Sequence, residues 1–209
     1  MQVDELYERC QSEPSDINEH LPTLFRYGKE CKSVTEMGVR SGRSTTAFLA
    51  ARPESLISYD IDGTYFREHV EPGYAKAAAE AGVSFRFEVA DVLGIEIAPT
   101  DLLFIDTWHV YDQLIQELRT HSPRVRKYIL LHDTETFGYV GEQTKGDRIK
   151  KDIAGFLART LSPKLSFEVP ARGGLKAAVA QFLEEDPRWE QREHFTNNNG
   201  LTVLARIKD

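Results

Sequence analysis

The 209-residue sequence has only two cysteines and no long apolar run. Cys10 and Cys31 make neither a disulfide framework nor a CxxC pair, so we expect reduced thiols in a cytosol-like compartment. No stretch reaches the roughly eighteen apolar residues of a membrane span. Residues 1–5 are acidic and lack the apolar core of a secretory signal. These features predict a cytoplasmic protein with no membrane segment.

A surplus of basic residues is also missing, since the formal net charge is −7. A negative chain is poorly suited to a surface devoted to phosphate backbones, so nucleic acid is not the expected partner. The length suits one substantial domain. We expect a small-molecule partner, and the sequence leaves a monomer and a homodimer open.

Strand-like and helix-like segments alternate from residue 33 to residue 133. Short β-branched and apolar runs predict strands, and helical spacing between them predicts helices. The predicted strands are Ser33–Met37, Leu56–Asp60, Val83–Ala90, Asp101–Asp106 and Lys127–His132, and the predicted helices are Ser44–Ala51, Tyr74–Ala81 and Tyr111–Thr120. This alternation is typical of βαβ units and predicts an α/β, Rossmann-like fold with helices on both faces of a mostly parallel sheet.

The C-terminal part changes this rhythm. A helix over Leu175–Leu183 precedes two strands, Trp189–Phe195 and Leu201–Ile207, which are joined by the turn sequence Asn197-Asn198-Asn199-Gly200. These strands predict an antiparallel pair that completes a seven-stranded sheet. A further helix is predicted over Arg148–Leu161.

The predicted organisation has two parts. Residues 1–32 form an N-terminal helical segment, with breaks near Pro14 and Pro22. Residues 33–209 form the domain that carries the sheet. Within it, residues 139–172 are expected to be an insertion that shapes the acceptor pocket.

Gly38 and Gly42 mark a turn after the first predicted strand, in the stretch Glu36-Met37-Gly38-Val39-Arg40-Ser41-Gly42-Arg43-Ser44. A Walker A loop needs one more residue and a lysine, and a dinucleotide fingerprint needs a glycine where Arg40 stands. The pattern fits a loop for S-adenosylmethionine (SAM), whose methionine part the glycine backbone can approach closely. Ser44 would bond the SAM carboxylate and Glu36 would attract the ammonium or sulfonium. A turn that serves packing alone is the alternative.

Acidic residues follow the next two predicted strands. Asp60 stands about twenty residues after Gly38, where an acid can bind both ribose hydroxyls, and Asp62 is the second choice. Asp91 follows the third strand and could bond the exocyclic amine of adenine. Because ligands of open α/β sheets bind at the carboxyl ends of the strands, these acids and Glu36 predict one nucleoside site.

The glycine loop and Asp60, together with Asp106-Thr107-Trp108-His109 and His132-Asp133-Thr134, resemble class I SAM-dependent methyltransferases. The narrower resemblance is to metal-dependent small-molecule O-methyltransferases such as catechol O-methyltransferase, and to the related group that includes the cephalosporin hydroxylases. It covers about residues 33–133 and the C-terminal strand pair. No Asp/Asn-Pro-Pro-Tyr/Phe motif of amino-methylating nucleic-acid enzymes follows the fourth strand. The resemblance therefore implies SAM, a small-molecule acceptor and oxygen as the methylated atom.

The same resemblance implies a metal site at Asp106, Asp133 and Thr134. Thr134 stands where catechol methyltransferases have asparagine. Two carboxylates and a third oxygen suit Mg²⁺, whereas His132 would suit a softer transition metal. Whether the chain uses a metal is left open.

Asp106 and His109 are the expected catalytic residues. His109 takes the place of a catalytic lysine and would act as a general base for the acceptor hydroxyl. Trp108 would pack on the adenine ring. An exposed histidine and a core tryptophan are the alternatives for these two positions. Phe137–Gly141 is expected to form an aromatic flap over the acceptor.

Two other functions remain open at this point. One is a SAM-binding domain without methyl transfer, and the other is an NAD- or iron-dependent oxidoreductase on a similar sheet.

Overall fold

The computed structural model describes residues 1–142 and 173–208. The predicted helix over Arg148–Leu161 lies outside the described residues, as does most of the predicted insertion, residues 139–172.

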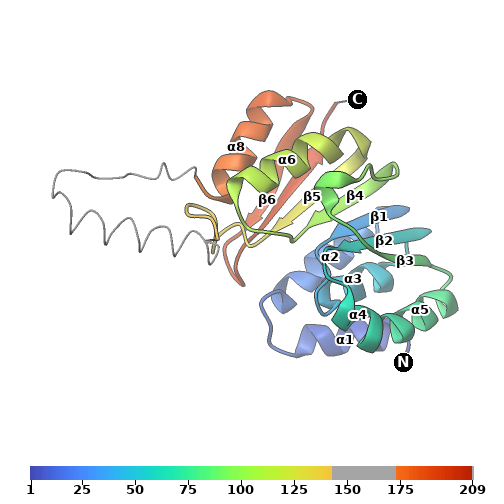
Figure 1. The fold of residues 1–209 in the computed structure, drawn as a ribbon. Helices are drawn as coiled ribbons and strands as arrows, with labels where there is room; N and C mark the ends of the chain where they lie inside the picture. Colours follow the sequence, from blue (N-terminus) through green and yellow to red (C-terminus); the bar gives the residue numbers. More distant parts are fainter. Residues whose placement is uncertain (143–172, 209) are drawn as a thin grey trace.

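A seven-stranded sheet forms the centre of the described chain, as Figure 1 shows. Its order is β3-β2-β1-β4-β5-β7-β6. The strands are β1 (Ser33–Met37), β2 (Ser55–Asp60), β3 (Ser84–Val89), β4 (Thr100–Ile105), β5 (Val125–His132), β6 (Trp189–Phe195) and β7 (Leu201–Arg206). β1 to β5 are parallel, and β7 is antiparallel to both β5 and β6. The predicted mostly parallel sheet with an antiparallel C-terminal pair is confirmed.

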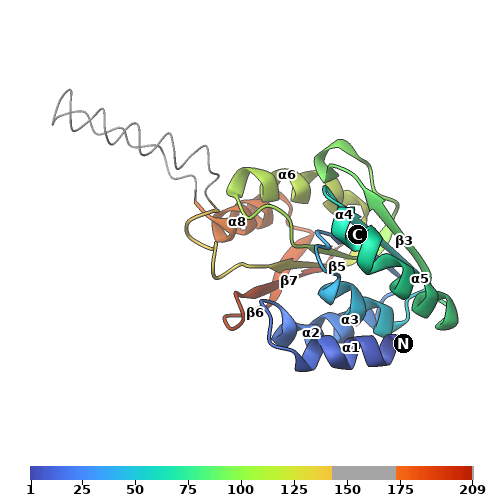
Figure 2. The same ribbon diagram turned by 60° about the horizontal axis from the view of Figure 1, so that its bottom comes forward.

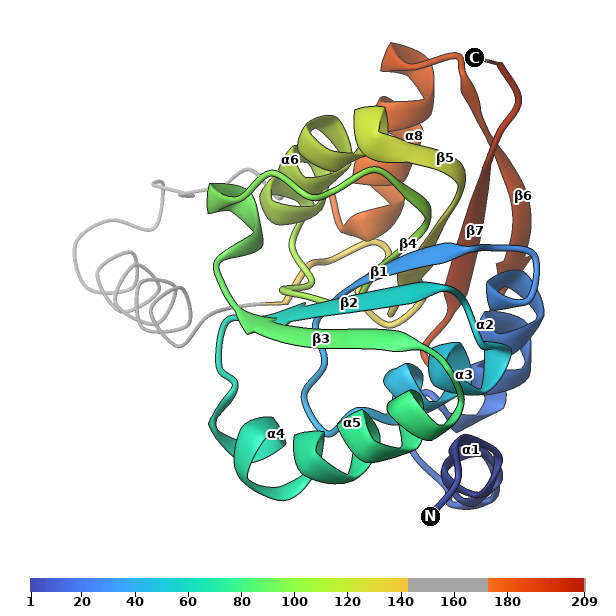
Figure 3. The ribbon, with the colours of Figure 1, turned by 90° about the vertical axis from the view of Figure 1, so that its right-hand side faces the viewer.

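Helices cover both faces of this sheet (Figure 3). They are α1 (Val3–Ser12), α2 (Leu21–Gly28), α3 (Arg43–Ala51), α4 (Thr64–His69), α5 (Glu71–Glu80), α6 (Tyr111–His121) and α8 (Leu175–Glu185), with 3-10 turns η1 (Asn18–His20), η2 (Val92–Gly94) and η3 (Ser122–Arg124). α4 was not predicted from the sequence. The described helices reach at most eleven residues, and none is long and apolar enough to cross a membrane.

Successive residues of the strands belong alternately to two hydrophobic cores, one on each face of the sheet. In β4, Leu102 and Phe104 join the core beneath α1, α2, α3 and α5, whereas Leu103 and Ile105 join the core beneath α6 and α8. Every residue of β4 is buried, as a central parallel strand between two helical layers requires. This burial on both faces fixes the register of the central strands, and with it the positions of the residues at their carboxyl ends.

The N-terminal helices belong to the first of these cores (Figure 2). Leu6, Cys10 and Leu24 are buried against Phe48 and Leu49 of α3. Between α1 and α2 the Ser15 hydroxyl accepts a hydrogen bond from the backbone N–H of Asn18 at 3.0 Å, which caps the short turn η1. Residues 13–16 thereby lie near the glycine loop.

Candidate functional site

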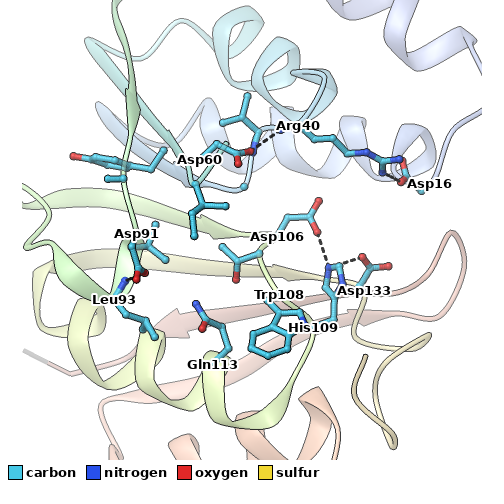
Figure 4. Close-up of a pocket in the computed structure, with 17 residues that line it drawn as sticks. Asp16, Arg40, Asp60, Asp91, Leu93, Asp106, Trp108, His109, Gln113 and Asp133 are labelled. Atoms are coloured by element: carbon cyan, nitrogen blue, oxygen red, sulfur yellow. Dashed lines mark hydrogen bonds and ion pairs between the residues drawn. The ribbon is translucent and has the colours of Figure 1, made fainter. Parts of the chain in front are cut away.

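One cavity of about 400 Å³ lies at the carboxyl ends of β1 to β5 (Figure 4). The residues that line it come from six segments of the chain: Asp16, Gly38, Val39, Arg40, Tyr59, Asp60, Ile61, Ala90, Asp91, Val92, Leu93, Asp106, Thr107, Trp108, His109, Gln113 and Asp133. The cavity occupies the crevice in which open α/β sheets bind ligands. Seven of the predicted site residues meet there, namely Gly38, Asp60, Asp91, Asp106, Trp108, His109 and Asp133.

Gly38 makes the floor of the cavity possible. Its φ is +87°, which favours glycine, and a Cβ at this position would lie 1.9 Å from the carbonyl oxygen of Asp106. The Gly38 N–H donates to the Tyr59 carbonyl at 2.9 Å. The glycine loop therefore lies directly against the ends of β2 and β4. A residue larger than glycine does not fit at position 38.

Gly42 has a different role. Its φ is +77°, and a Cβ there would meet the rings of Phe66 and Tyr74 at 2.7 and 2.9 Å. It is absent from the lining of the cavity. Gly42 lets α3 begin close to α4 and α5, so packing explains this second glycine.

Glu36 and Ser44 face each other beneath the loop instead of lining the cavity. Glu36 is fully buried and accepts hydrogen bonds from the hydroxyls of Ser44, Thr45 and Ser58 at 2.5, 2.8 and 2.6 Å. Burial raises the pKa of Glu36 to about 7, although the three hydroxyls oppose this shift. The direct ligand contacts expected for these two residues are not formed by this arrangement, which instead braces the loop from below.

Asp60 ties the glycine loop to the end of β2. Its Oδ2 accepts the backbone N–H groups of Val39 and Arg40, both at 2.8 Å, and its Oδ1 accepts from Asp62 at 3.0 Å. The carboxylate still lines the cavity. Carboxylate oxygens have about four lone-pair sites, so Asp60 can hold the loop and also accept from a ligand hydroxyl.

Asp91 borders the end of the cavity that lies away from His109, and Trp108 lies between Gln113 and His109 (Figure 4). Asp91 caps η2 by accepting the Leu93 N–H at 3.0 Å. Trp108 is 46% exposed, so the alternative of a core tryptophan is wrong. An exposed indole in a ligand-sized cavity offers a flat apolar surface.

The opposite end holds a cluster of Asp106, His109 and Asp133. The His109 Nε2 lies 2.8 Å from Asp133 Oδ2 and 3.2 Å from Asp106 Oδ1. Its Nδ1 lies 3.1 Å from the Glu142 carboxylate, and its ring stacks on Phe137 with centroids 4.7 Å apart. Asp133 adopts a φ of +59° immediately after β5, a left-handed backbone conformation that L residues other than asparagine and aspartate rarely adopt.

The charges in this cluster depend on one another. Burial disfavours charge on His109, but hydrogen bonds and attraction from Asp106 and Asp133 outweigh it and raise the pKa to about 10. Burial likewise opposes ionisation of Asp106 and Asp133. His109 and the neighbouring His132 nevertheless keep the pKa of each carboxyl below its usual value. Without another cation, His109 therefore holds a proton at neutral pH.

His132 lies behind the cluster. It is 3% exposed, with Nδ1 3.4 Å from Asp106 Oδ1 and 3.5 Å from Asp133 Oδ2, and its pKa is raised to about 10 by these carboxylates against the effect of burial. Its ring meets that of His20 edge to face. His132 thus balances the charge of the aspartates from the buried side.

Thr134 does not join the cluster. It is fully buried, and its Oγ1 accepts a hydrogen bond from the Thr202 hydroxyl at 3.0 Å on the other side of the chain. The left-handed turn at Asp133 sends the next side chain away from the cavity. The Thr134 hydroxyl thus faces Thr202 and not the cluster, and the residue that lies with Asp106 and Asp133 is His109.

The three residues of the cluster fit a divalent cation. One ligand atom from each lies within 4.8 Å of the others. Oδ1 of Asp133 is buried without a hydrogen-bond partner, a cost that a bound cation would remove. A nitrogen and two carboxylates suit Mn²⁺, Fe²⁺ or Zn²⁺ as well as Mg²⁺.

Comparison with known proteins identifies the central part of the chain. Residues 35–134, which run from β1 to the end of β5, match the family model described as a methyltransferase domain. Over these residues the chain is similar to a methyltransferase domain. The resemblance to class I methyltransferases is confirmed, and the match spans the glycine loop, Asp60 and the Asp106–His109–Asp133 cluster.

Solved structures share the fold of the methyltransferase domain over nearly the whole chain. A candidate caffeoyl-CoA O-methyltransferase from Staphylococcus aureus aligns with a TM-score of 0.62 at 12% identity, covering 99% of this chain and 92% of that one. An O-methyltransferase from Bacillus cereus in complex with SAH (S-adenosylhomocysteine) aligns at 0.56 and 10% identity, covering 98% and 90%. An SAH-bound methyltransferase from Podospora anserina aligns at 0.50 and 18%, covering 99% and 88%. No curated protein matches the sequence.

The structure adds residues that the sequence did not reveal. Asp16 reaches the cavity of the methyltransferase domain from the N-terminal segment and pairs with Arg40. Glu117, fully buried in α6, accepts from Thr107 at 2.7 Å and from Gln113 at 2.8 Å, both of which line the cavity. The only sequence signal for Glu117 is an acid on the apolar side of α6, and Asp16 gave no signal at all.

Proposed function

We propose that the protein is a SAM-dependent methyltransferase that methylates a hydroxyl group of a small molecule. The observation that carries this proposal is that one cavity joins Gly38, Asp60 and the cluster of Asp106, His109 and Asp133. The first two suit the amino-acid and sugar parts of a nucleoside, and the cluster suits a hydroxyl that must lose a proton. The O-methyltransferases among the structural neighbours support oxygen as the acceptor atom.

We assign the nucleoside to the end of the cavity that holds Asp60 and Asp91, with Trp108 beside it on the side of His109 (Figure 4). SAM supplies a methyl group already activated by its sulfonium, so the protein mainly has to align the acceptor and exclude water. Gly38 would lie under the amino-acid tail, Asp60 would accept from the ribose, and Trp108 would pack on adenine. Glu36 and Ser44 would act indirectly, by holding the loop.

At the other end, we assign the acceptor hydroxyl to the Asp106–His109–Asp133 cluster. A divalent cation held by these residues would lower the pKa of a bound hydroxyl. A proton on His109 and a cation between the carboxylates are alternative ways of balancing the same two negative charges. A cation held by Asp106 and Asp133 alone would return His109 to its neutral form, in which an imidazole can accept a proton. A cation bound also to His109 Nε2 would occupy the lone pair of that nitrogen, so His109 would then be a ligand and not the base. Phe137, stacked on His109, would keep water from one side of this centre.

Titration calorimetry with SAM and SAH, followed by a methyl-transfer assay on a panel of hydroxyl compounds with EDTA or with Mg²⁺, Mn²⁺ or Zn²⁺, tests the proposal. The expected result is micromolar binding of SAH and metal-stimulated transfer to oxygen. Binding of SAH without transfer to any acceptor supports the binding-only alternative. NAD binding tighter than SAM binding, or iron in the purified protein with oxidation of the panel, supports an oxidoreductase.

A further inference from the structure

Arg40 occupies an unusual position in the glycine loop. Its φ is +50°, and its backbone N–H is held by Asp60 Oδ2 at 2.8 Å. A left-handed backbone is less favourable for arginine than for glycine, because the Cβ approaches the following carbonyl oxygen. The side chain runs from the loop to Asp16 along one border of the cavity (Figure 4). A costly backbone geometry at a residue that borders a ligand cavity is a reason to look for its use.

The Arg40 side chain is held only loosely. Its Nη1 lies 2.7 Å from Asp16 Oδ2, and the two side chains are 84% and 48% exposed. Ion pairs as exposed as this one contribute little to stability. Arginine has five N–H donors, and this single contact engages one nitrogen of the guanidinium. Most of its donors are therefore available for a planar anion that would take the place of Asp16.

The charges of the residues that line the cavity support a role for Arg40 in binding an anion. Besides Arg40, the charged side chains of this lining are the five aspartates Asp16, Asp60, Asp91, Asp106 and Asp133, and the histidine His109. Arg40 is thus the one lysine or arginine among the described residues that line the cavity. Figure 4 shows its side chain on the side of the Asp106–His109–Asp133 cluster, away from Asp91 and Leu93. An anionic group carried by the acceptor would meet Arg40 while the hydroxyl reached the cluster.

We propose that Arg40 is a specificity-determining residue that binds a carboxylate group of the acceptor by displacing Asp16, so that the acceptors are hydroxy acids. This inference rests on the proposed function, because it assumes that the nucleoside occupies the other end of the cavity. A guanidinium accepts a carboxylate through two parallel hydrogen bonds, a geometry that the single contact with Asp16 does not use.

The test compares acceptor pairs that differ by one carboxylate. The probes are catechol against 3,4-dihydroxybenzoate and glucose against glucuronate, titrated into protein saturated with SAH and then assayed for methyl transfer with SAM. In the natural sequence the acid of at least one pair should bind about tenfold more tightly than its neutral partner. Arg40→Gln should remove this preference, Arg40→Lys should restore it in part, and Asp16→Asn should strengthen binding of the acid by about threefold.

Arg52 provides the matched control. It also has a positive φ, +58°, and pairs with an aspartate of the N-terminal segment, Asp4 at 2.7 Å, but it lies outside the cavity. Arg52→Gln should leave the preference for acids unchanged. If Arg52→Gln and Arg40→Gln have equal effects, loosening of the N-terminal segment explains the result and the inference fails.

Three further outcomes overturn the inference. The first is that the natural sequence, loaded with SAH, prefers the neutral member of every pair or binds no acid. The second is that Arg40→Gln weakens both members of a pair equally. The third is that Arg40→Gln weakens SAH and not the acceptor, which would assign the guanidinium to the carboxylate of the nucleoside ligand. In each case SAH binding by the natural sequence and methyl transfer to any acceptor of the hydroxyl panel, both measured first, show independently whether the proposed function stands.

Discussion

The carboxylates at the two ends of the cavity have different kinds of partner. At the end formed by β2 and β3, Asp60 and Asp91 accept hydrogen bonds from backbone N–H groups of their own loops. At the end formed by β4 and β5, Asp106 and Asp133 face histidines, and Oδ1 of Asp133 has no partner. The first end is complete without a ligand, since each acid already has a structural role. The second is balanced by protons on histidines, which another positive charge could replace.

Gly38 joins the two ends, and its substitution should have the largest effect. Gly38→Ala adds a Cβ 1.9 Å from the Asp106 carbonyl oxygen at a φ of +87°. We expect a loss of about 3 kcal/mol or more in the free energy of unfolding, with loss of both SAH binding and transfer. Urea unfolding and calorimetry measure these quantities.

Gly82→Ala is the matched control for Gly38. Gly82 has a φ of +74°, but a Cβ at this position would meet nothing within 4 Å, so only the backbone cost of about 1 kcal/mol applies. Equal destabilisation by the two substitutions would show that the contact with Asp106 is not what requires glycine at position 38.

Asp133→Asn tests the cluster end alone. Asparagine tolerates the left-handed backbone of this position and keeps the shape of the side chain, but it removes one negative charge. We expect methyl transfer to fall by about 100-fold or more, with weaker metal binding, while the SAH affinity changes by less than about threefold. A parallel loss of SAH affinity would mean that the two ends do not act separately.

Asp60→Asn tests the nucleoside end. The amide can accept only at one atom, so the loop loses part of its charge-assisted hydrogen bonding from Val39 and Arg40. We expect about tenfold weaker SAH binding, with little change in the rate at saturating SAM. Asp62→Asn is the control, because the Asp62 carboxylate accepts the Thr64 N–H and is absent from the lining of the cavity. A larger effect of Asp62→Asn would reassign the ribose contact to that residue.

The smallest effect concerns pH and the proton on His109. A histidine whose pKa is raised to about 10 on folding adds stability that is complete below its unfolded pKa of about 6.5 and is lost as the pH rises toward 10. The difference in unfolding free energy between the natural sequence and His109→Gln, measured in EDTA, should therefore shrink from pH 6 to pH 10. A difference that is constant with pH would mean that His109 is neutral in the folded protein.

Much of the fold followed from the sequence because central parallel strands have a clear signature. β1 was predicted at its observed bounds, and β4 within one residue, since both consist of residues buried by two helical layers. α4 was missed because it has six residues and buries only Phe66 among them. A single buried residue gives no helical period to detect.

The site was predictable only where backbone topology decides it. Strand ends in a parallel sheet must share one edge, so Asp60, Asp91, Asp106 and Asp133 were correctly expected to lie together. Side-chain direction was not predictable. The reversal at Asp133 that turns Thr134 inward depends on a φ of +59°, and the pairing of Glu36 with Ser44 depends on how the loop folds back over it.

The turn between β6 and β7 connects parts of the chain that are far apart in sequence. Asn198 donates from Nδ2 to the Ser15 carbonyl at 2.8 Å and accepts the Glu19 N–H on Oδ1 at 3.1 Å, contacts that span 183 and 179 residues. These bonds clasp the stretch that carries Asp16. Substitutions in the turn between β6 and β7 would therefore shift the stretch around Asp16, which borders the cavity. Sequence changes at this turn are thus a way to alter substrate preference without a change in the other residues of the cavity.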